Sequence, residues 1–485
     1  MSSDNRTVVE SVAPEDVWRL FAELSEIPRC SRQEDRVREW ILSIAEERGL
    51  SSKTDSVGNI LVSKRGTGAL EDKPPLAIQA HIDMVCEKNS GTIHDFERDP
   101  IRLRRESDWI AADKTTLGAD NGIAVAMMLA LLTGAYEHPP LECLFTIDEE
   151  SGLTGATKLD ANLLTAKRLI NIDTEEEGHF CIGCAGGRNS YAYLPVSFDR
   201  ATGEAYRLTV TGLKGGHSGI NIGEGRGCSL ELAARVLYGL HREFPSLRIV
   251  DLQGGDKHNA IPREFEATLL APAGAEGVTE AVERWHEQLL GELGDIEEKL
   301  TVAVEPVETE VGEAMSEEST AALIRMMAAM PHGVLSISRA VPGLVETSTN
   351  FAAIRVHQGE VKVLTSQRSN LASGVDDAVR RVRAVVELAG GRVEEAEGYP
   401  AWTPEPDSDL LRRAVEVYRR STGGDPVVEA VHAGLECGVI GDKYPGMEMI
   451  SFGPDIEGAH TPEERVRVSS VERVWQFLLL LLREL

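Results

Sequence analysis

The sequence predicts an α/β protein in which a mostly parallel sheet is covered by helices, with a second, α+β domain inserted into the first. Three observations lead to this prediction. Short apolar runs alternate with helical patterns from the start of the chain to about residue 187. Alternating strands and amphipathic helices follow, and the βα pattern resumes from about residue 399. We therefore assign residues 1–187 and 398–485 to one discontinuous domain and residues 188–397 to the insertion.

The first segment contains the elements of the parallel sheet. Helical spacing of apolar residues predicts helices over 17–27 and 35–48, and an uninterrupted apolar run predicts a core helix over 123–132. Three further runs are apolar on both faces, which is typical of strands buried between helices. These predicted strands span 76–80, 141–147 and 169–172.

The later segments follow the same logic. In the insertion, the patterns predict strands over 206–210, 265–270 and 361–365, and amphipathic helices over 230–238 and 278–293. The last part of the chain returns to the first domain. Its predicted elements are a helix over 407–421, a strand over 447–452 and a closing helix over 471–485.

Composition excludes several classes of protein. The hydrophobic fraction of 42% is enough to build cores, so the chain of 485 residues is not intrinsically disordered. The formal charge is 50 − 79 = −29, which argues against nucleic acid or an anionic membrane as a partner, because both need clustered Lys and Arg. The longest apolar runs are far shorter than the ~20 residues that span a bilayer.

Cysteine usage and the N-terminus indicate a compartment. The first residues are polar and acidic and lack an apolar stretch of signal-peptide length. Seven cysteines, an odd number spread over a long chain, predict reduced thiols rather than a disulfide framework. We therefore expect a cytoplasmic protein.

Four groups of polar residues stand at the ends of buried runs or at the start of the core helix. Taken alone, the first three have ordinary structural explanations, namely a satisfied core histidine, a helix N-cap and a solvated turn, and the fourth is an acid at the end of a buried run. In an open parallel sheet, however, ligands bind beyond the carboxyl ends of the strands, where such residues converge. The groups are His81-Ile82-Asp83, Gly118-Ala119-Asp120-Asn121-Gly122, Asp148-Glu149-Glu150 and Asn171-Ile172-Asp173.

Convergent carboxylates call for a cation. Without one they would repel each other and raise each other's pKa. Oxygen ligands with a few imidazoles suit zinc, with Mn²⁺ or Co²⁺ as plausible substitutes. A shared carboxylate would hold two ions ~3.5–4 Å apart with an activated water between them.

The ordered set of motifs resembles the M20 group of dinuclear metallopeptidases, most closely its aminoacyl-histidine dipeptidase branch. The resemblance covers nearly the whole chain. Besides the four groups above, it includes Gly215-Gly216-His217-Ser218-Gly219, Asn259-Ala260-Ile261-Pro262, His432-Ala433-Gly434-Leu435-Glu436-Cys437 and Gly458-Ala459-His460.

The resemblance implies a zinc-peptidase-like catalytic domain with two Zn²⁺ ions. Asp120 would bridge the ions, Glu149 would be the general base, and Asp83 would orient His81. The five implied ligands are His81, Asp120, Glu150, Asp173 and His460.

The resemblance also implies that the insertion is a lid and dimerisation domain, so a homodimer is expected. His217 would stabilise the tetrahedral oxyanion, and Arg368 would grip the terminal carboxylate of the substrate. Asn259 and Glu436 are further candidates for substrate binding, although a turn or a surface salt bridge explains these two and Arg368 about as well.

The chain departs from the branch pattern at two places. Lys114 stands where Gly is expected, and Cys228-Ser229 stands where Asn-Ala is usual. Neither departure touches an implied ligand, so they bear on specificity and lid packing. Cys181-Ile182-Gly183-Cys184 has the spacing of a redox or zinc motif, but it has no second pair, and buried thiols are the favoured interpretation.

The leading hypothesis is therefore a cytoplasmic, zinc-dependent dipeptidase of broad specificity that acts on small unblocked dipeptides, with the Xaa-His type, such as β-Ala-His, as the favoured substrates. In this hypothesis, two zinc ions would activate a bridging hydroxide toward the scissile carbonyl, and Glu149 would shuttle the proton to the leaving amine. The alternatives are a tripeptidase or an N-acyl amino acid amidohydrolase of the same fold, and, in another class, a non-catalytic metal-binding homologue. A nucleotide-dependent dehydrogenase is disfavoured because no Gly-x-Gly-x-x-Gly follows the first strand.

Overall fold

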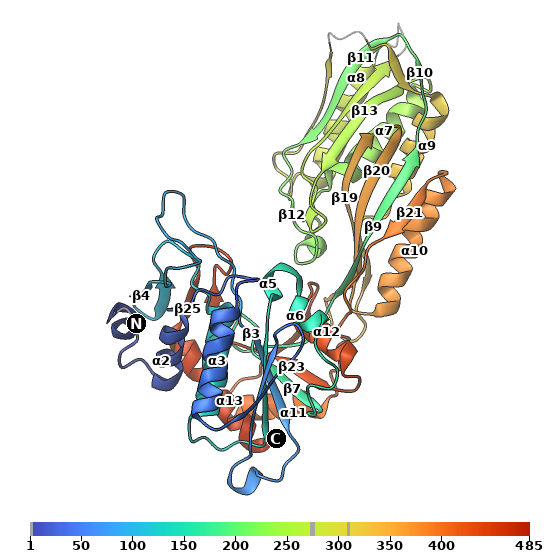
Figure 1. Cartoon of the computed structure of the whole chain (residues 1–485). Coiled ribbons are helices and arrows are strands. Elements are labelled where there is room, and N and C mark those ends of the chain that lie inside the picture. Colours follow the sequence, from blue (N-terminus) through green and yellow to red (C-terminus); the bar gives the residue numbers. More distant parts are fainter. Residues whose placement is uncertain (1–2, 272–276, 308–310) are drawn as a thin grey trace. The chain divides into compact units, whose positions relative to one another are not determined.

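The chain folds into two compact units in a computed structural model that describes residues 3–271, 277–307 and 311–485 (Figure 1). The first unit comprises Met1–Gly183, Trp402–Ala430 and Leu435–Leu485. The second comprises Cys184–Ala401 and Val431–Gly434. The chain therefore builds most of the second unit between two parts of the first, and it contributes to the second unit again at Val431–Gly434 before it completes the first.

The described residues of the first unit form an eight-stranded sheet in the order β1-β2-β6-β3-β7-β23-β8-β22. Its centre is parallel, because β3 pairs in parallel with β6 and β7, and β7 with β23. The pairs β1–β2, β2–β6 and β23–β8 are antiparallel. The strands are β1 Ser51–Thr54, β2 Ile60–Lys64, β3 Leu76–His81, β6 Leu141–Thr146, β7 Arg168–Asn171, β8 His179–Cys184, β22 Val427–Val431 and β23 Glu448–Ser451.

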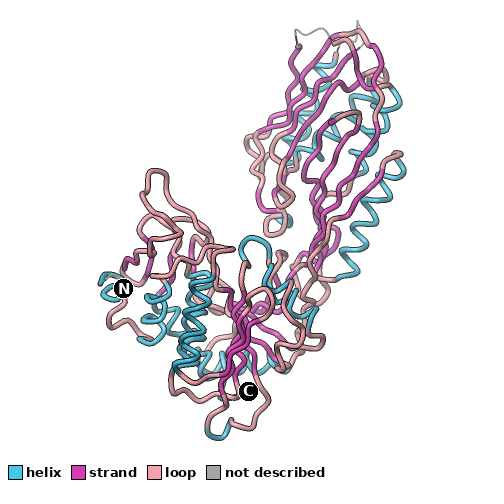
Figure 2. The backbone as a smooth tube through the Cα atoms, viewed as in Figure 1, coloured by secondary structure: helices cyan, strands magenta, loops and turns pink. Residues whose placement is uncertain are grey.

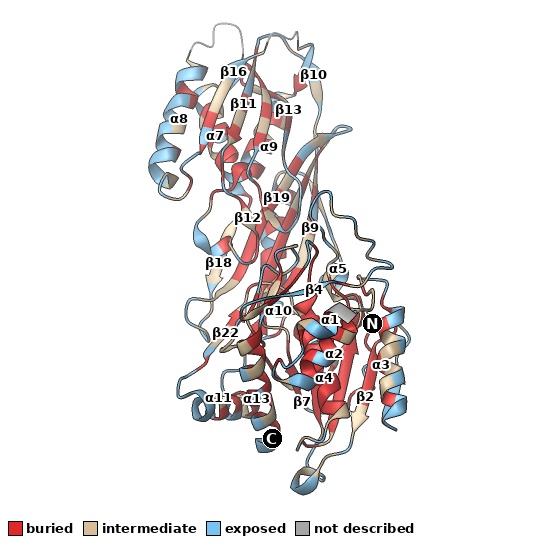
Figure 3. Cartoon of the chain, turned by 90° about the vertical axis from the view of Figure 1, so that its left-hand side faces the viewer, coloured by how far each residue is buried: buried red, intermediate tan, exposed pale blue. Residues whose placement is uncertain are grey.

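Helices enclose this sheet. β3 and β6 are buried at every position. The same is true of α4 from Asn121 to Leu132, and Figure 3 shows α4 mostly in the colour of buried residues. Burial on both faces explains why these sequences are largely apolar. A separate small sheet has the order β24-β25-β5-β4, from Ile456–Glu457, Arg465–Arg467, Trp109–Ala112 and Leu103–Glu106. The helices are α1 Ser3–Val8, α2 Glu15–Leu24, α3 Asp35–Glu47, α4 Ala119–Thr133, α5 Glu149–Gly152, α6 Thr154–Thr157, α11 Asp409–Thr422, α12 Glu436–Lys443 and α13 Val468–Glu484, with a 3-10 turn at Gly68–Leu70.

The second unit is built on long antiparallel strands with helices packed along them (Figure 2). In the described part, its main sheet has the order β16-β11-β15-β13-β19-β20-β9-β21, with β18 paired to β19. The strands are β9 Gly186–Pro195, β11 Glu204–Thr211, β13 Arg248–Gly255, β15 Phe265–Ala271, β16 Thr301–Pro306, β18 Gly333–Ile337, β19 Val345–His357, β20 Glu360–Ser369 and β21 Arg392–Glu395. Two short pairs are β10 Phe198–Arg200 with β17 Glu313–Met315, and β12 Gly216–His217 with β14 Ala260–Ile261.

One hydrophobic core joins alternate residues of these strands to the helices of the second unit. In β11, for example, Leu208 and Val210 are buried while their neighbours are not, which is the period-two pattern of a sheet covered on one face. The helices are α7 Ser229–Glu243, α8 Val278–Leu293, α9 Glu317–Ala329 and α10 Ala372–Leu388, with a 3-10 turn at Ile222–Glu224.

The predicted α/β fold class is confirmed, and the elements agree with their predicted types. The differences lie at boundaries. The strand predicted over 361–365 continues to Ser369, so Arg368 lies within β20 rather than after it. The core helix is assigned from Ala119, although Asp120 and Asn121 depart from helical backbone angles. Across the described residues, the structure contains no helix that is both long and apolar enough to cross a bilayer.

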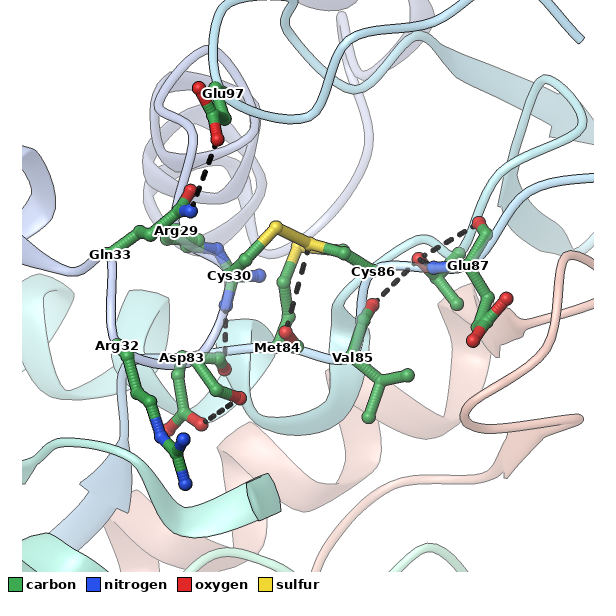
Figure 4. Close-up of a disulfide and its surroundings, with 12 residues drawn as sticks. Arg29, Cys30, Arg32, Gln33, Asp83, Met84, Val85, Cys86, Glu87 and Glu97 are labelled. Atoms are coloured by element: carbon green, nitrogen blue, oxygen red, sulfur yellow. Dashed lines mark hydrogen bonds between the residues drawn. A yellow bond between two sulfur atoms is a disulfide. The ribbon is translucent and has the colours of Figure 1, made fainter.

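The prediction of reduced thiols is wrong at one pair of cysteines. Cys30 and Cys86 form a disulfide whose Cα atoms lie 5.7 Å apart (Figure 4). The pairing joins two loops separated by 56 residues, which a count of scattered cysteines does not reveal. The other five cysteines are buried, including Cys181 and Cys184 of the C-x-x-C sequence.

Candidate metal centre

The predicted ligands of the first unit come together at the carboxyl edge of its sheet. His81 is the last residue of β3, and Asp173 follows β7 by two residues. Glu150 lies in the one-turn helix α5, which begins soon after β6 ends. Asp120 lies at the start of α4, and His460 in the loop between β24 and β25. These positions follow from the topology, because parallel neighbouring strands end at the same edge.

Asp120 lies between the two histidines. Its Oδ1 atom is 3.1 Å from Nε2 of His81, and its Oδ2 atom is 3.1 Å from Nε2 of His460. Each carboxylate oxygen therefore faces a different imidazole. This is the arrangement expected of a carboxylate shared by two cations.

The remaining two acids each lie beside one histidine. Nε2 of His460 is 2.9 Å from Oε2 of Glu150, and Nε2 of His81 is 3.5 Å from Oδ1 of Asp173. The cluster thus has two halves, with His81 and Asp173 in one, His460 and Glu150 in the other, and Asp120 in both. Ligand-type atoms of His81, Asp120 and Glu150 lie within 4.8 Å of one another.

The electrostatics of the cluster show why it suits a cation. Burial raises the pKa of Glu150, and nearby Asp120 raises it further. Hydrogen bonds that His460 donates to the carboxylates of Asp120 and Glu150 raise the pKa of its ring to about 11. Although burial opposes the ionised form of Asp120, hydrogen bonds from His460 and His81 hold its pKa below the usual value. Without a metal, protons on the imidazoles therefore compensate the negative charge of the carboxylates. A bound metal pair would compensate the same charge.

A further observation supports the fit to a metal. Of the side-chain atoms in the described residues, Oε1 of Glu150 is one that is buried without a hydrogen-bond partner. A buried carboxylate oxygen left in this way is costly unless a ligand satisfies it. Two imidazoles and three carboxylates with an unsatisfied oxygen form a donor set that zinc accepts, as do manganese and cobalt.

Asp83 connects the two motif loops next to the cluster. One carboxylate oxygen lies 3.4 Å from Nδ1 of His81, which leaves Nε2 of the ring directed to Asp120 and Asp173. The same carboxylate accepts hydrogen bonds from the backbone N–H groups of Glu149 and Glu150, at 3.0 and 3.2 Å. Asp83 therefore fixes both a histidine ring and the start of α5.

Glu149 lies in α5 beside Glu150, in a strongly acidic environment. Burial raises its pKa well above the usual value; the charge of His81 opposes this rise, while those of Asp173 and Glu436 add to it. A carboxylate in this place gains a proton readily, as a general base must.

Two residues that support the cluster were missed by the sequence analysis. The carboxylate of Glu464 accepts backbone N–H groups from four consecutive residues, Leu117 to Asp120. The guanidinium of Arg29 donates to the carbonyl oxygens of Ile82, Asp83 and Gly118. Both side chains bind main-chain atoms of distant segments, and no local sequence pattern marks such a partner.

Gly118 shows how closely these groups approach. Its φ of +70° is in the left-handed region, and an added Cβ would lie 2.5 Å from Nη2 of Arg29. Only glycine combines that backbone conformation with room for the buried guanidinium.

Glu436 is also part of the first unit, as the first residue of α12. Its side chain is 1% exposed, and Oε2 accepts hydrogen bonds from Gln79 Nε2 and Thr146 Oγ1, at 2.6 and 2.7 Å. Burial raises its pKa to about 7. Its suggested part in substrate binding stays a prediction.

His217 belongs to the second unit, in the short strand β12. Its Nδ1 atom accepts the backbone N–H groups of Gly219 and Ile220, at 3.3 and 3.2 Å. Burial lowers the pKa of the ring, and the charge of Arg368 lowers it further. The imidazole is therefore neutral at pH 7 with its proton on Nε2, which makes Nε2 a hydrogen-bond donor.

The other two predicted binding residues lie in the same unit. Arg368 is 6% exposed and donates from Nη1 to the hydroxyl of Tyr399 at 2.8 Å, while its Nε is buried with no hydrogen-bond partner in the described segments. Such a guanidinium has donors left for an anionic ligand. Asn259 is exposed, and its backbone carbonyl oxygen accepts the N–H of Ser218, so it borders the His217 loop.

The sequence of residues 77–484 matches the profile of one known family, described as peptidase family M20/M25/M40. This match covers most of the chain and both units. The chain belongs to this family. The resemblance inferred from the motifs is thereby confirmed, and the protein is an M20 peptidase.

Two relatives align with this M20 peptidase over almost its whole length. The cytosol non-specific dipeptidase of Escherichia coli K12 is 38% identical over 481 residues, covering 98% of this chain and 99% of the relative. The crystal structure of aminoacylhistidine dipeptidase from Vibrio alginolyticus is also 38% identical, with a TM-score of 0.93 and 98% of each chain covered. A tripeptidase structure from Staphylococcus aureus covers 98% of each chain at 16% identity, with a TM-score of 0.55, and shows the shared fold alone.

Proposed function

We propose that this M20 peptidase is a dipeptidase that uses two zinc ions to hydrolyse unblocked dipeptides, including the Xaa-His type. The observation that carries the proposal is the position of Asp120, with one carboxylate oxygen toward His81 and the other toward His460. His81 and Asp173 would hold one ion, His460 and Glu150 would hold the other, and Asp120 would contribute to both. The names of the two relatives at 38% identity support the substrate class.

In the proposed reaction, Glu149 is the general base. When bound, zinc supplies Lewis acidity toward a carbonyl oxygen and toward water. Glu149 takes a proton from the attacking water and gives it to the nitrogen of the leaving amine. Asp83 supports this step, because its carboxylate accepts a hydrogen bond from the backbone N–H of Glu149 at 3.0 Å and so positions this residue.

His217 and Arg368 act on the substrate in this proposal. Nε2–H of His217 donates to the oxyanion that forms from the scissile carbonyl, which a neutral ring with Nδ1 occupied by two N–H groups can do. Arg368 holds the terminal carboxylate of the dipeptide, with Asn259 and Glu436 as further substrate-binding candidates.

Location and assembly belong to the same proposal. We expect a cytoplasmic enzyme, in line with the cytosolic name of the Escherichia coli relative. We expect a homodimer formed through the second unit, which the resemblance to the family implies.

The experiment that tests the function combines metal content with a substrate panel. Purified protein is analysed for bound metal and assayed with several Xaa-His dipeptides, other dipeptides, a tripeptide and an N-acetyl amino acid. We expect about two zinc ions per chain and hydrolysis of the dipeptides. Preference for the tripeptide or the N-acetyl amino acid would instead indicate one of the related amide hydrolases. Bound zinc without hydrolysis of any amide would indicate a non-catalytic homologue.

A further inference from the structure

The segment 29–34 contacts three of the loops that carry the proposed metal centre. Arg29 reaches the carbonyl oxygens of Ile82, Asp83 and Gly118. Glu34 accepts the backbone N–H of Asp148 at 3.0 Å, directly before Glu149. One short stretch of chain therefore ties together the loops of His81, Asp120 and Glu150 (Figure 4 shows its first residues).

Ser31 makes a direct contact with the carboxylate that orients the cluster. Its Oγ donates to Oδ2 of Asp83 at 2.8 Å. The same oxygen, Oδ2, accepts the backbone N–H of Glu150. A shift of Ser31 would therefore move the Asp83 carboxylate and, through it, both the His81 ring and the start of α5.

The disulfide Cys30–Cys86 locks this segment onto the chain that follows Asp83. Cys30 stands between Arg29 and Ser31, and Cys86 stands three residues after Asp83. Beside the covalent link, the backbone N–H of Met84 donates to the carbonyl oxygen of Arg29 at 3.1 Å. Both cysteines are only partly buried, so a reductant can approach the bond.

We infer that the segment 29–34 is a positioning element for the metal centre and that the Cys30–Cys86 disulfide places this positioning under thiol redox control. The inference rests on the proposed metal-dependent function. In the oxidised form, the covalent link restricts how far Arg29 and Ser31 can move from the loop of His81 and Asp83. In the reduced form, only hydrogen bonds hold them, so the ligands are less well organised and metal affinity falls.

The redox step needs a dithiol as co-reactant, such as a protein of the thioredoxin type. A thiolate of the dithiol attacks one sulfur of the Cys30–Cys86 bond, which forms a mixed disulfide and releases the other cysteine. The second thiolate of the dithiol then attacks the mixed disulfide and releases the remaining cysteine of this protein. Two electrons and two protons pass to Cys30 and Cys86, and the dithiol becomes a disulfide. In a cytoplasmic protein, partly exposed disulfides are characteristically redox-sensing rather than structural.

The first test compares the two redox states of the whole enzyme. Thiol titration of unfolded protein should count five thiols before reduction with a water-soluble phosphine and seven after it, because five cysteines lie outside the bond. With Zn²⁺ as the probe, in competition with a chromophoric chelator, reduction should weaken the apparent affinity about tenfold. The double variant Cys30→Ser/Cys86→Ser should have the Zn²⁺ affinity of the reduced enzyme, and the phosphine should not change that affinity.

The outcomes separate this inference from the proposed function. Seven thiols under oxidising conditions, or equal Zn²⁺ affinity in both redox states of an active enzyme, would overturn the redox control alone. Absence of Zn²⁺ binding in both states would overturn the proposed function as well.

The second test uses Ser31→Ala, which removes one hydrogen bond and leaves the disulfide intact. We expect Zn²⁺ affinity and kcat to fall about tenfold with little change in KM, and with an unchanged far-ultraviolet circular dichroism spectrum. The matched control is Ser43→Ala, on the exposed face of α3, where the hydroxyl bonds only the carbonyl of Trp40. Equal Zn²⁺ affinity in the two variants would contradict the positioning role.

Discussion

Nε2 of His460 lies 3.1 Å from Oδ2 of Asp120, although 340 residues separate the two in the sequence. The second unit is inserted between them, so the first unit is complete only after the chain returns to it. The pair brings the last ligand of the proposed centre onto the oxygen of Asp120 that does not face His81. Asp120 is therefore the residue on which both halves of the cluster depend.

Replacing Asp120 by Asn should remove both metal ions together. The amide keeps the volume of the side chain, but it loses the charge and one of the two acceptor oxygens that face His81 and His460. We expect Zn²⁺ affinity to fall by more than about 100-fold, beyond the loss usual for a residue that only supports a ligand. Metal analysis after gel filtration measures this. Asp113→Asn, an exposed acid close by in the sequence, is the control and should keep about two ions.

Replacing Glu149 by Gln should stop turnover while metal stays bound. Glutamine has nearly the same shape but cannot take up the proton of the attacking water, and a general base contributes about 10²–10⁴-fold in rate. We expect kcat to fall by about 10³-fold with metal content unchanged. Glu71→Gln, an exposed acid of the same unit, should behave as wild type. A near-normal kcat in the Glu149 variant would show that Glu149 is not the general base.

A large part of this centre could be predicted from the sequence, because local hydrophobic patterns indicate the strands whose ends hold the ligands. His81, Glu150 and Asp173 follow buried apolar runs, so a parallel sheet brings them to one edge without knowledge of any contact. His460 is different, since it follows the two-residue strand β24 and reached the ligand set only through the resemblance to a family.

Other features lay beyond sequence reasoning for a physical reason. Arg29 and Glu464 bind backbone atoms, which every residue has, so nothing in the partner's sequence reveals the contact. The Cys30–Cys86 bond depends on two loops meeting in space, and a count of scattered cysteines pointed the other way.

Replacing Glu464 by Gln should weaken the metal centre from outside it. The carboxylate receives four backbone N–H groups with its two oxygens, and an amide has one oxygen with which to accept them. At least one buried N–H is then left unsatisfied, and the loop that ends at Asp120 loosens. We expect Zn²⁺ affinity and kcat to fall by about 10–100-fold. Glu463→Gln, the exposed neighbour, should change neither; equal losses in both variants would contradict this role.

Replacing Arg368 by Met should affect substrates only through their terminal carboxylate. The buried guanidinium is the proposed partner of that carboxylate, and removing one side of such a pair costs several kcal/mol. We expect KM for a dipeptide to rise about 30-fold or more with a small change in kcat, and KM for the dipeptide amide to stay constant. Arg355→Met, an exposed arginine on β19, is the control. A similar rise in KM for the amide would show that Arg368 does not read the carboxylate.

His432 should make stability depend on pH between about 4 and 6.5. It is 7% exposed, its Nε2 lies 2.7 Å from Ser348 Oγ, and burial, with the charges of Arg368 and His217, lowers its pKa from 6.5 to about 4. Because the folded pKa is depressed, the unfolded chain binds the proton first as pH falls, so this contribution is complete above pH 6.5 and is lost toward pH 4. At pH 5 the loss is about 2 kcal/mol of the free energy of unfolding.

The measurement is urea unfolding of wild type and His432→Gln at pH 7.5 and pH 5. Other groups, including those of the metal centre, titrate in both proteins and cancel in the comparison. The variant loses the Ser348 contact at both pH values, so it should be less stable than wild type at pH 7.5. Glutamine does not take up a proton in this pH range, so the variant lacks the pH-dependent loss. The stability difference between the two proteins should therefore narrow by about 2 kcal/mol at pH 5. A difference that stays constant with pH would show that His432 does not titrate in this range.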